Sequence, residues 1–124
     1  MDLKRNAQFK KALITLEEAL KQKQNDFVRD SVIQRFEYTV ELFWKLLKEY
    51  LNMEGLSPNS PMNVIRESRN IGLLNDDEVE LALDMILDRN RSSHAYHEEI
   101  ANQIAKKAKD YAKFMSDIEK RLNK

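Results

Sequence analysis

The chain has 124 residues, of which 34% are charged, and its 21 Lys and Arg balance 21 Asp and Glu. This length suits one domain with its own core, so we expect residues 1–124 to form a single domain. Zero net charge confines any nucleic-acid contact to a local basic patch. The absence of cysteine excludes disulfides and thiolate metal sites. With no membrane-length apolar run and no apolar signal region, we expect a cytoplasmic protein with no membrane contact.

The sequence pattern favours helices, because glycine and proline occur only twice each. The first helix is predicted over residues 3–23. An apolar stripe at spacings of four, three and four marks it: Phe9, Leu13, Leu16 and Leu20. The stretch "KQNDF" breaks this pattern, and Asn25 or Asp26 is the expected N-cap of the next helix.

A long second helix is predicted over residues 27–53, and its apolar seam is widened by Trp44. The seam consists of Ile33, Phe36, Val40, Phe43, Leu47 and Leu51. Gly55 should end the helix, and "GLSPNSP" reads as a loop. Ser60 before Pro61 then predicts the N-cap of a short helix, "PMNVIRESRN", which stops near Gly72.

Two more long helices complete the predicted fold. Asn75 should start the first, with three carboxylates in its first turn, and this helix should fray over residues 90–93. Val79, Leu83 and Ile86 are expected to face inward, with Ala82 and Leu87 beside them. The last helix is predicted over residues 97–122, with an unbroken apolar stripe. The expected fold is all-α, a mostly up-and-down antiparallel bundle of four long helices plus one short helix.

The polar stretch "DRNRSSHAYHEE" at residues 88–99 holds both histidines of the chain. His94 can move a proton near neutral pH, Arg89 can hold a phosphate, and Arg91 could add a phosphate contact. These groups suffice for metal-free RNA cleavage. In one straight helix, however, Arg89 and His94 point to different sides, because five residues turn the chain about 140° beyond a full turn. A bend at "RSS" or a second copy across a two-fold axis would be needed.

Simpler interpretations stand beside each of these features. From spacing alone, the stretch is more often an ordinary polar corner between helices. A metal site at His94, His97 and Glu98 is least favoured, because "HAYHE" is not the H-E-x-x-H pattern of zinc hydrolases. Tyr96 is expected to pack at the corner, although an exposed phenol available for modification is the alternative.

Two charged stretches outside the corner also have alternative readings. Glu37, Glu41 and Lys45 lie at spacings of four, which favours a solvated outer stripe over a polar network beside the site. The basic run "KKAKD" at residues 106–110 is expected to be a solvated face.

Together these segments resemble a known family. "RNRSSHAY" matches the R-N-x-x-x-H-x-Y signature of the HEPN superfamily, in its HepT-like or nucleotidyltransferase substrate-binding branch. "QRFEYTVELFWKLLKEYL" is similar to the second helix of that branch, and "SPMNVIRESRNIGLL" to its short middle helix and turn. The segments occur in the family's order, and the resemblance covers nearly the whole chain.

The resemblance implies a helical homodimer, whose two motifs meet near the two-fold axis, and a partner, a minimal nucleotidyltransferase encoded by a neighbouring gene. It implies a toxin, a metal-independent endoribonuclease without a cofactor, that the partner silences by AMP transfer to Tyr96. Arg89 and His94 would be catalytic, and Asn90, Arg91 and Ser93 would support them. The alternative in this branch is a non-catalytic subunit that binds nucleotide or substrate for the nucleotidyltransferase.

Overall fold

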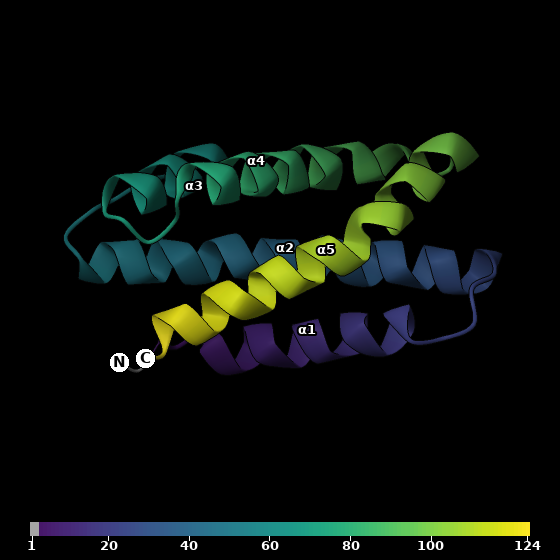
Figure 1. Ribbon diagram of the computed structural model, residues 1–124, viewed down its shortest axis with the longest axis horizontal. Coiled ribbons are helices and arrows are strands. Elements are labelled where there is room, and N and C mark those ends of the chain that lie inside the picture. The colour runs from purple at the N-terminus through teal and green to yellow at the C-terminus, as the bar shows by residue number, and fades with distance from the viewer. Residues whose placement is uncertain (1–2) are drawn as a thin grey trace.

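Five α-helices and one turn of 3₁₀ helix form the computed structural model, which describes residues 3–124 (Figure 1). The helices are α1 (Asn6–Leu20), α2 (Asp26–Met53), α3 (Pro61–Asn70), α4 (Asp76–Arg91) and α5 (Glu98–Leu122), with the 3₁₀ turn η1 (Ser92–His94) before α5. No strand occurs in this part of the chain. The predicted all-α class is therefore confirmed.

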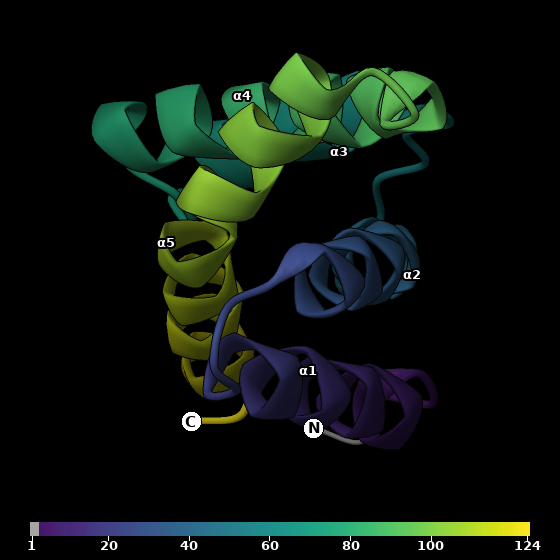
Figure 2. The ribbon, with the colours of Figure 1, turned by 90° about the vertical axis from the view of Figure 1, so that its right-hand side faces the viewer.

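The four long helices alternate in direction, and α3 lies between α2 and α4 in the chain (Figure 1). Seen end-on, α2 lies between α1 on one side and α3 and α4 on the other, while α5 packs along the side of this stack (Figure 2). The two ends of the described chain lie close together, and Asn123 Nδ2 donates to Asn6 Oδ1 at 3.0 Å. None of the described helices is long and apolar enough to cross a membrane.

The core is centred on α2, whose predicted apolar seam is buried along its whole length. Phe43 of this seam contacts Phe9 of α1 and Phe114 of α5, with ring centroids 5.6 and 5.8 Å apart. Full burial of a side chain of this size stabilises the fold by roughly 1.5–3 kcal/mol. The seam of α2 thus fixes α1 and α5 against one surface.

The inner face of α4 differs from the prediction at Leu87, which the sequence pattern places beside the inward-facing residues. Leu87 is 49% exposed, whereas Met85, which the pattern did not select, is fully buried. Ala82, Met85 and Ile86 follow one another at helical spacing, so they share the face that meets the core. Leu87 lies about 100° further around the helix and is left on the outside.

Local capping explains where the helices begin and end. Asn25, Ser60 and Asn75 each accept a hydrogen bond from a backbone N–H three residues later, at 2.9, 3.2 and 2.9 Å, as N-caps do. Gly55 and Gly72 have φ values of 87° and 80° just beyond α2 and α3, a left-handed conformation that glycine adopts without strain.

The first helix is shorter than predicted, Asn6–Leu20 rather than residues 3–23. Its N-terminus has no side-chain cap, and the final residues of the predicted range lie in a turn. The predicted N-cap at Asn25 and the predicted start at Ser60–Pro61 are confirmed.

Candidate functional site

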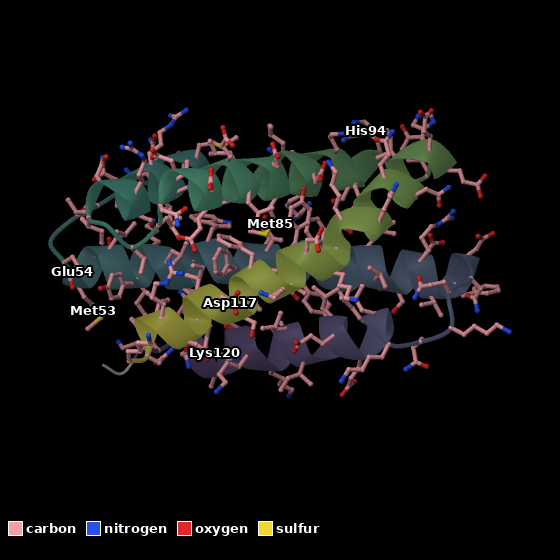
Figure 3. All side chains as sticks on the ribbon, in the orientation of Figure 1. Met53, Glu54, Met85, His94, Asp117 and Lys120 are labelled. Atoms are coloured by element: carbon pink, nitrogen blue, oxygen red, sulfur yellow. The ribbon has the colours of Figure 1, made fainter. Side chains whose placement is uncertain are left out.

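The chain bends between α4 and α5, at the position where the sequence predicts fraying. α4 ends at Arg91, η1 follows, and His97 occupies the N-cap position of α5 without a side-chain capping bond. Backbone bonds from Ala95 N to Ser92 O at 3.1 Å and from His97 N to His94 O at 3.0 Å close successive turns. His94 projects outward at this corner, at the far end of the molecule from Met53 and Glu54 (Figure 3).

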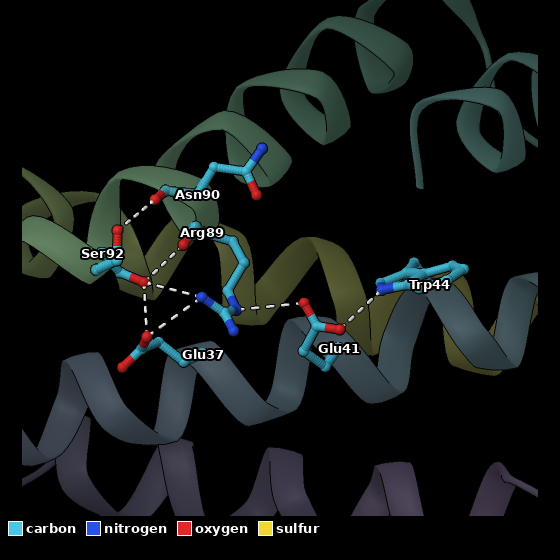
Figure 4. A network of polar contacts seen from close by, with 7 residues as sticks. Glu37, Glu41, Trp44, Arg89, Asn90 and Ser92 are labelled. Carbon is cyan, nitrogen blue, oxygen red and sulfur yellow. Dashed lines mark hydrogen bonds and ion pairs between the residues drawn. The ribbon is translucent and has the colours of Figure 1, made fainter. Parts of the chain in front are cut away.

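Arg89 is turned toward α2, where two carboxylates receive it (Figure 4). Its Nη1 donates to Glu37 Oε2 at 3.2 Å. Its Nε lies 3.3 Å from Glu41 Oε1 but is buried without an aligned hydrogen bond. Because one guanidinium meets two carboxylates, this cluster has a surplus negative charge rather than an open cationic site.

Ser92 completes the cluster, and the predicted supporting residue Ser93 does not join it. Ser92 Oγ lies 2.8 Å from Glu37 Oε2, 2.6 Å from the carbonyl oxygen of Arg89 and 3.3 Å from Arg89 Nη1. A hydroxyl has one hydrogen, so it donates to one of the two oxygens at a time while it accepts from the guanidinium. Ser93 is exposed and donates to Asn90 O at 3.1 Å in its own turn.

The expectation of a solvated stripe is wrong for Glu37 and Glu41, which form the polar network weighed as its alternative. Trp44 Nε1 extends this network by donating to Glu41 Oε2 at 3.2 Å. Lys45 forms no hydrogen bond or ion pair with these residues in the described chain. Sequence spacing places the two glutamates on one face of α2. Their partner, Arg89, is identified only by the way α4 packs against α2.

His94 and Tyr96 form a second, separate pair on the outer side of the corner. His94 Nδ1 lies 3.3 Å from Tyr96 Oη, and the rings meet edge-on with centroids 5.9 Å apart. Tyr96 is 75% exposed, so the prediction that it packs in the corner is wrong. The ring of His97 also contacts Tyr96, at a tilt of 40° and with a centroid distance of 4.4 Å. The phenol is therefore accessible, and it touches both histidines.

A single protomer does not join the two predicted catalytic side chains. No hydrogen bond or ion pair links Arg89 to His94 among residues 3–124. Asn90 is exposed, and its own side chain forms no hydrogen bond in the same range, although its backbone oxygen accepts from Ser93. Arg89 faces α2 while His94 contacts Tyr96 beyond the end of α4, so the bend after Arg91 does not by itself bring the two side chains together.

Arg91 is directed toward α5 by a buried acid that sequence reasoning missed. Asp88 is 3% exposed and accepts from Arg91 Nη1 at 3.1 Å and from Tyr111 Oη at 2.5 Å. Arg91 Nη2 also donates to Gln103 Oε1 at 2.6 Å. Burial, together with the Asp88 carboxylate, raises the pKa of Tyr111 above its ordinary value, so its hydroxyl stays a donor.

The described residues contain no group of three or more His, Asp or Glu side chains placed to hold a metal ion. At the corner, the contacts given above join His94 and His97 to Tyr96 rather than to a cluster of carboxylates.

Comparison with known proteins gives a match over nearly the whole chain. The family model described as "Nucleotidyltransferase substrate binding protein like" matches residues 4–124. A crystal structure of a protein from Thermus thermophilus is 45% identical, covers 94% of this chain and 99% of its own, and superposes with a TM-score of 0.90. No curated protein matches the chain significantly.

Proposed function

The chain belongs to the nucleotidyltransferase substrate-binding protein family, and on that premise we propose that it is an RNA-cleaving toxin silenced by a nucleotidyltransferase partner. The observation that carries the proposal is the exposed pair of His94 and Tyr96, whose polar atoms lie 3.3 Å apart. A proton-transfer group and a modifiable hydroxyl thus occupy the same accessible point. Modification of the second group would act directly on the first.

The proposed cleavage needs no metal. His94 takes the proton of the RNA 2′-hydroxyl as its oxygen attacks phosphorus, or gives a proton to the departing 5′-oxygen. The P–O5′ bond breaks as the new P–O2′ bond forms, which leaves a cyclic phosphate and a 5′-hydroxyl. A guanidinium near the phosphorus would stabilise the negative charge that builds there.

That guanidinium is proposed to come from Arg89 within a homodimer. In one protomer Arg89 faces α2 and His94 faces outward, so a second copy is the route by which the motifs would meet. Asn90 and Ser93 would support the site from its exposed side, and Arg91, at the end of α4, from the side where it bonds to Gln103 of α5.

AMP transfer to Tyr96 is proposed as the silencing step. The tyrosine oxygen attacks the α-phosphorus of ATP, pyrophosphate leaves, and the phenolic proton goes to solvent or to His94. Because Tyr96 Oη lies against His94 Nδ1, the attached phosphate would occupy the space beside the imidazole and exclude an RNA phosphate. The added negative charge would also repel the RNA backbone.

The deciding experiment is cleavage of total tRNA by purified protein in the presence of EDTA. Wild type should cut, His94→Ala should not, and His97→Ala should cut at the wild-type rate. His97 is the matched control, because it is an exposed histidine in the same corner that also touches Tyr96. Equal behaviour of wild type and His94→Ala would refute the nuclease.

One observation favours a second function, a non-catalytic subunit that binds nucleotide or substrate for the nucleotidyltransferase. The charge of Arg89 is already matched by Glu37 and Glu41, which suits a structural role. This alternative predicts that the protein binds a nucleotide or the partner enzyme, leaves RNA intact, and is harmless when expressed alone.

A further inference from the structure

Two hollows follow one another along the side of α5. They lie in the region where the paths of α5 and α1 diverge (Figure 1). Each has a volume of about 480 Å³, and the two adjoin at Leu20, which lines both of them. One wall is the C-terminal end of α1 and the start of α2, and the other is α5 from Asn102 to Lys120. We call this feature the α1–α5 groove.

The charge of the groove differs from that of the whole chain. Six basic and three acidic side chains line it, although the protein has equal numbers of each. Four of the basic groups stand on one face of α5 at spacings of three, four and seven: Lys106, Lys109, Lys113 and Lys120. Lys21 faces them from the end of α1. The row spans about 21 Å at 1.5 Å per residue.

Most of these ammonium groups have no intramolecular partner. Within residues 3–124, Lys113 forms the row's one ion pair, with Asp117 at 3.4 Å, and both side chains are at least half exposed. Such a pair is worth little in water and can exchange its carboxylate for another anion. The basic run "KKAKD", expected to be only a solvated face, thus contributes two lysines to a shaped basic surface.

We propose that the α1–α5 groove binds the sugar–phosphate backbone of single-stranded RNA. Lysines are point charges on flexible stems, so a row of them suits a chain of regularly spaced phosphates more than one fixed ligand. The apolar residues that line the groove, Leu20, Ala105 and Ala112, include no aromatic side chain and offer no large anchor for a protein partner.

The groove also leads toward the corner. Arg29, which lines its second hollow, donates to Asn102 Oδ1 at 3.1 Å and to Glu98 Oε1 at 3.3 Å. Glu98 is the first residue of α5 and lies four residues after His94. A strand lying in the groove would therefore approach the corner from α5. This inference rests on the proposed function and assigns the path of its substrate.

The test measures binding of a fluorescent single-stranded RNA by anisotropy over a range of KCl concentrations. All proteins carry His94→Ala, so binding is measured without cleavage. The groove variant is Lys109→Gln/Lys113→Gln/Lys120→Gln. The matched control, Lys11→Gln/Lys45→Gln/Lys48→Gln, removes the same charge from exposed or half-exposed sites outside the groove. Circular dichroism melting checks that both variants fold.

The groove variant should bind at least tenfold more weakly near 0.1 M salt. The magnitude of its slope in a plot of log binding constant against log salt concentration should decrease by about 2. Each of the three lost phosphate contacts on a single strand removes about 0.7 from that magnitude. The control should keep the parental slope. The proposal is overturned if the parental protein binds no RNA, if the groove variant binds like it, or if the control loses as much.

A second probe separates RNA from an acidic protein. Poly-glutamate of equal charge should bind at least tenfold more weakly than the RNA; equal affinity with equal sensitivity to the groove variant would overturn the RNA assignment. The outcomes also separate this inference from the nuclease. If the protein binds RNA in the groove but does not cut it, the groove proposal holds and the nuclease proposal fails. If the protein cuts RNA but the groove variant binds RNA as well as the parental protein does, the nuclease proposal holds and the groove proposal fails.

Discussion

Tyr111 donates its hydroxyl to Asp88 at 2.5 Å in the interior, and this bond ties α5 to α4 beside the corner. Asp88 and Tyr111 are 3% and 1% exposed. A buried carboxylate is stable only when donors surround it, and Arg91 and Lys107 provide charge at 3.1 and 3.5 Å. Asp88, which immediately precedes Arg89, is thus fixed in position.

Replacing Tyr111 by Phe should lower the free energy of unfolding by about 1.5–3 kcal/mol, because a bond to a buried charged acceptor is lost without a replacement donor. Urea denaturation measures the change. Tyr38→Phe is the matched control, since Tyr38 is 39% exposed and its hydroxyl bonds to Thr15 near the surface. That control should change stability by less than about 0.5 kcal/mol. Equal effects of the two substitutions would contradict the assigned role of Asp88.

The ion pair between Arg121 and Glu78 predicts a pH-dependent contribution to stability. Nη1 and Nη2 of Arg121 donate to the two carboxylate oxygens of Glu78 at 2.9 and 2.8 Å, and these bonds hold the pKa of Glu78 below its ordinary value. A depressed pKa stabilises the fold above the unfolded-state pKa, and this stability is lost as the pH falls through the folded-state value.

Arg121→Gln should therefore cost about 1 kcal/mol at pH 7, and its difference from wild type should shrink once the pH falls below about 4. Urea midpoints measured from pH 7 to pH 3 check this. Arg69→Gln is the control, because it removes a pair with Asp76 that lies in the open and should have a smaller effect at every pH. If the stability difference between wild type and Arg121→Gln grows toward acid pH, the pair does not stabilise the fold in the way proposed.

The two neighbouring serines of the corner give a matched comparison. Ser92 is 5% exposed and joins Arg89 to Glu37, whereas Ser93 is exposed and bonds only within its turn. Ser92→Ala should cost about 1 kcal/mol and slow RNA cleavage, because Arg89 loses one of its supports. Ser93→Ala should change both by much less. A larger effect of Ser93→Ala than of Ser92→Ala would instead support the sequence-based expectation that Ser93 is the supporting residue.

The starts of α2, α3 and α4 could be predicted from the sequence because capping is local. Asn25, Ser60 and Asn75 each bond within the first turn of their own helix, so a few neighbouring residues suffice. The bend after Arg91 could also be anticipated, because serines compete with helical backbone bonds.

The partners of the site could not be predicted in this way. Glu37 and Glu41 are more than forty positions before Arg89, and which side of α2 meets α4 depends on how the bundle packs. The contact of His94 with Tyr96 joins residues two apart, which point to different sides of a regular helix. It arises from the irregular turn, which periodicity does not describe.

Tyr96→Phe tests the proposed silencing step without disturbing the fold, because the side chain is 75% exposed and loses only its hydroxyl. With the proposed nucleotidyltransferase partner and ATP, the intact mass of wild type should rise by one AMP and its RNA cleavage should fall. Tyr96→Phe should gain no mass and keep cutting in the same mixture. Tyr38→Phe, which also removes a partly exposed hydroxyl, should still be modified. A mass increase on Tyr96→Phe would place the acceptor elsewhere in the chain, and modified wild type that still cuts RNA would separate the modification from silencing.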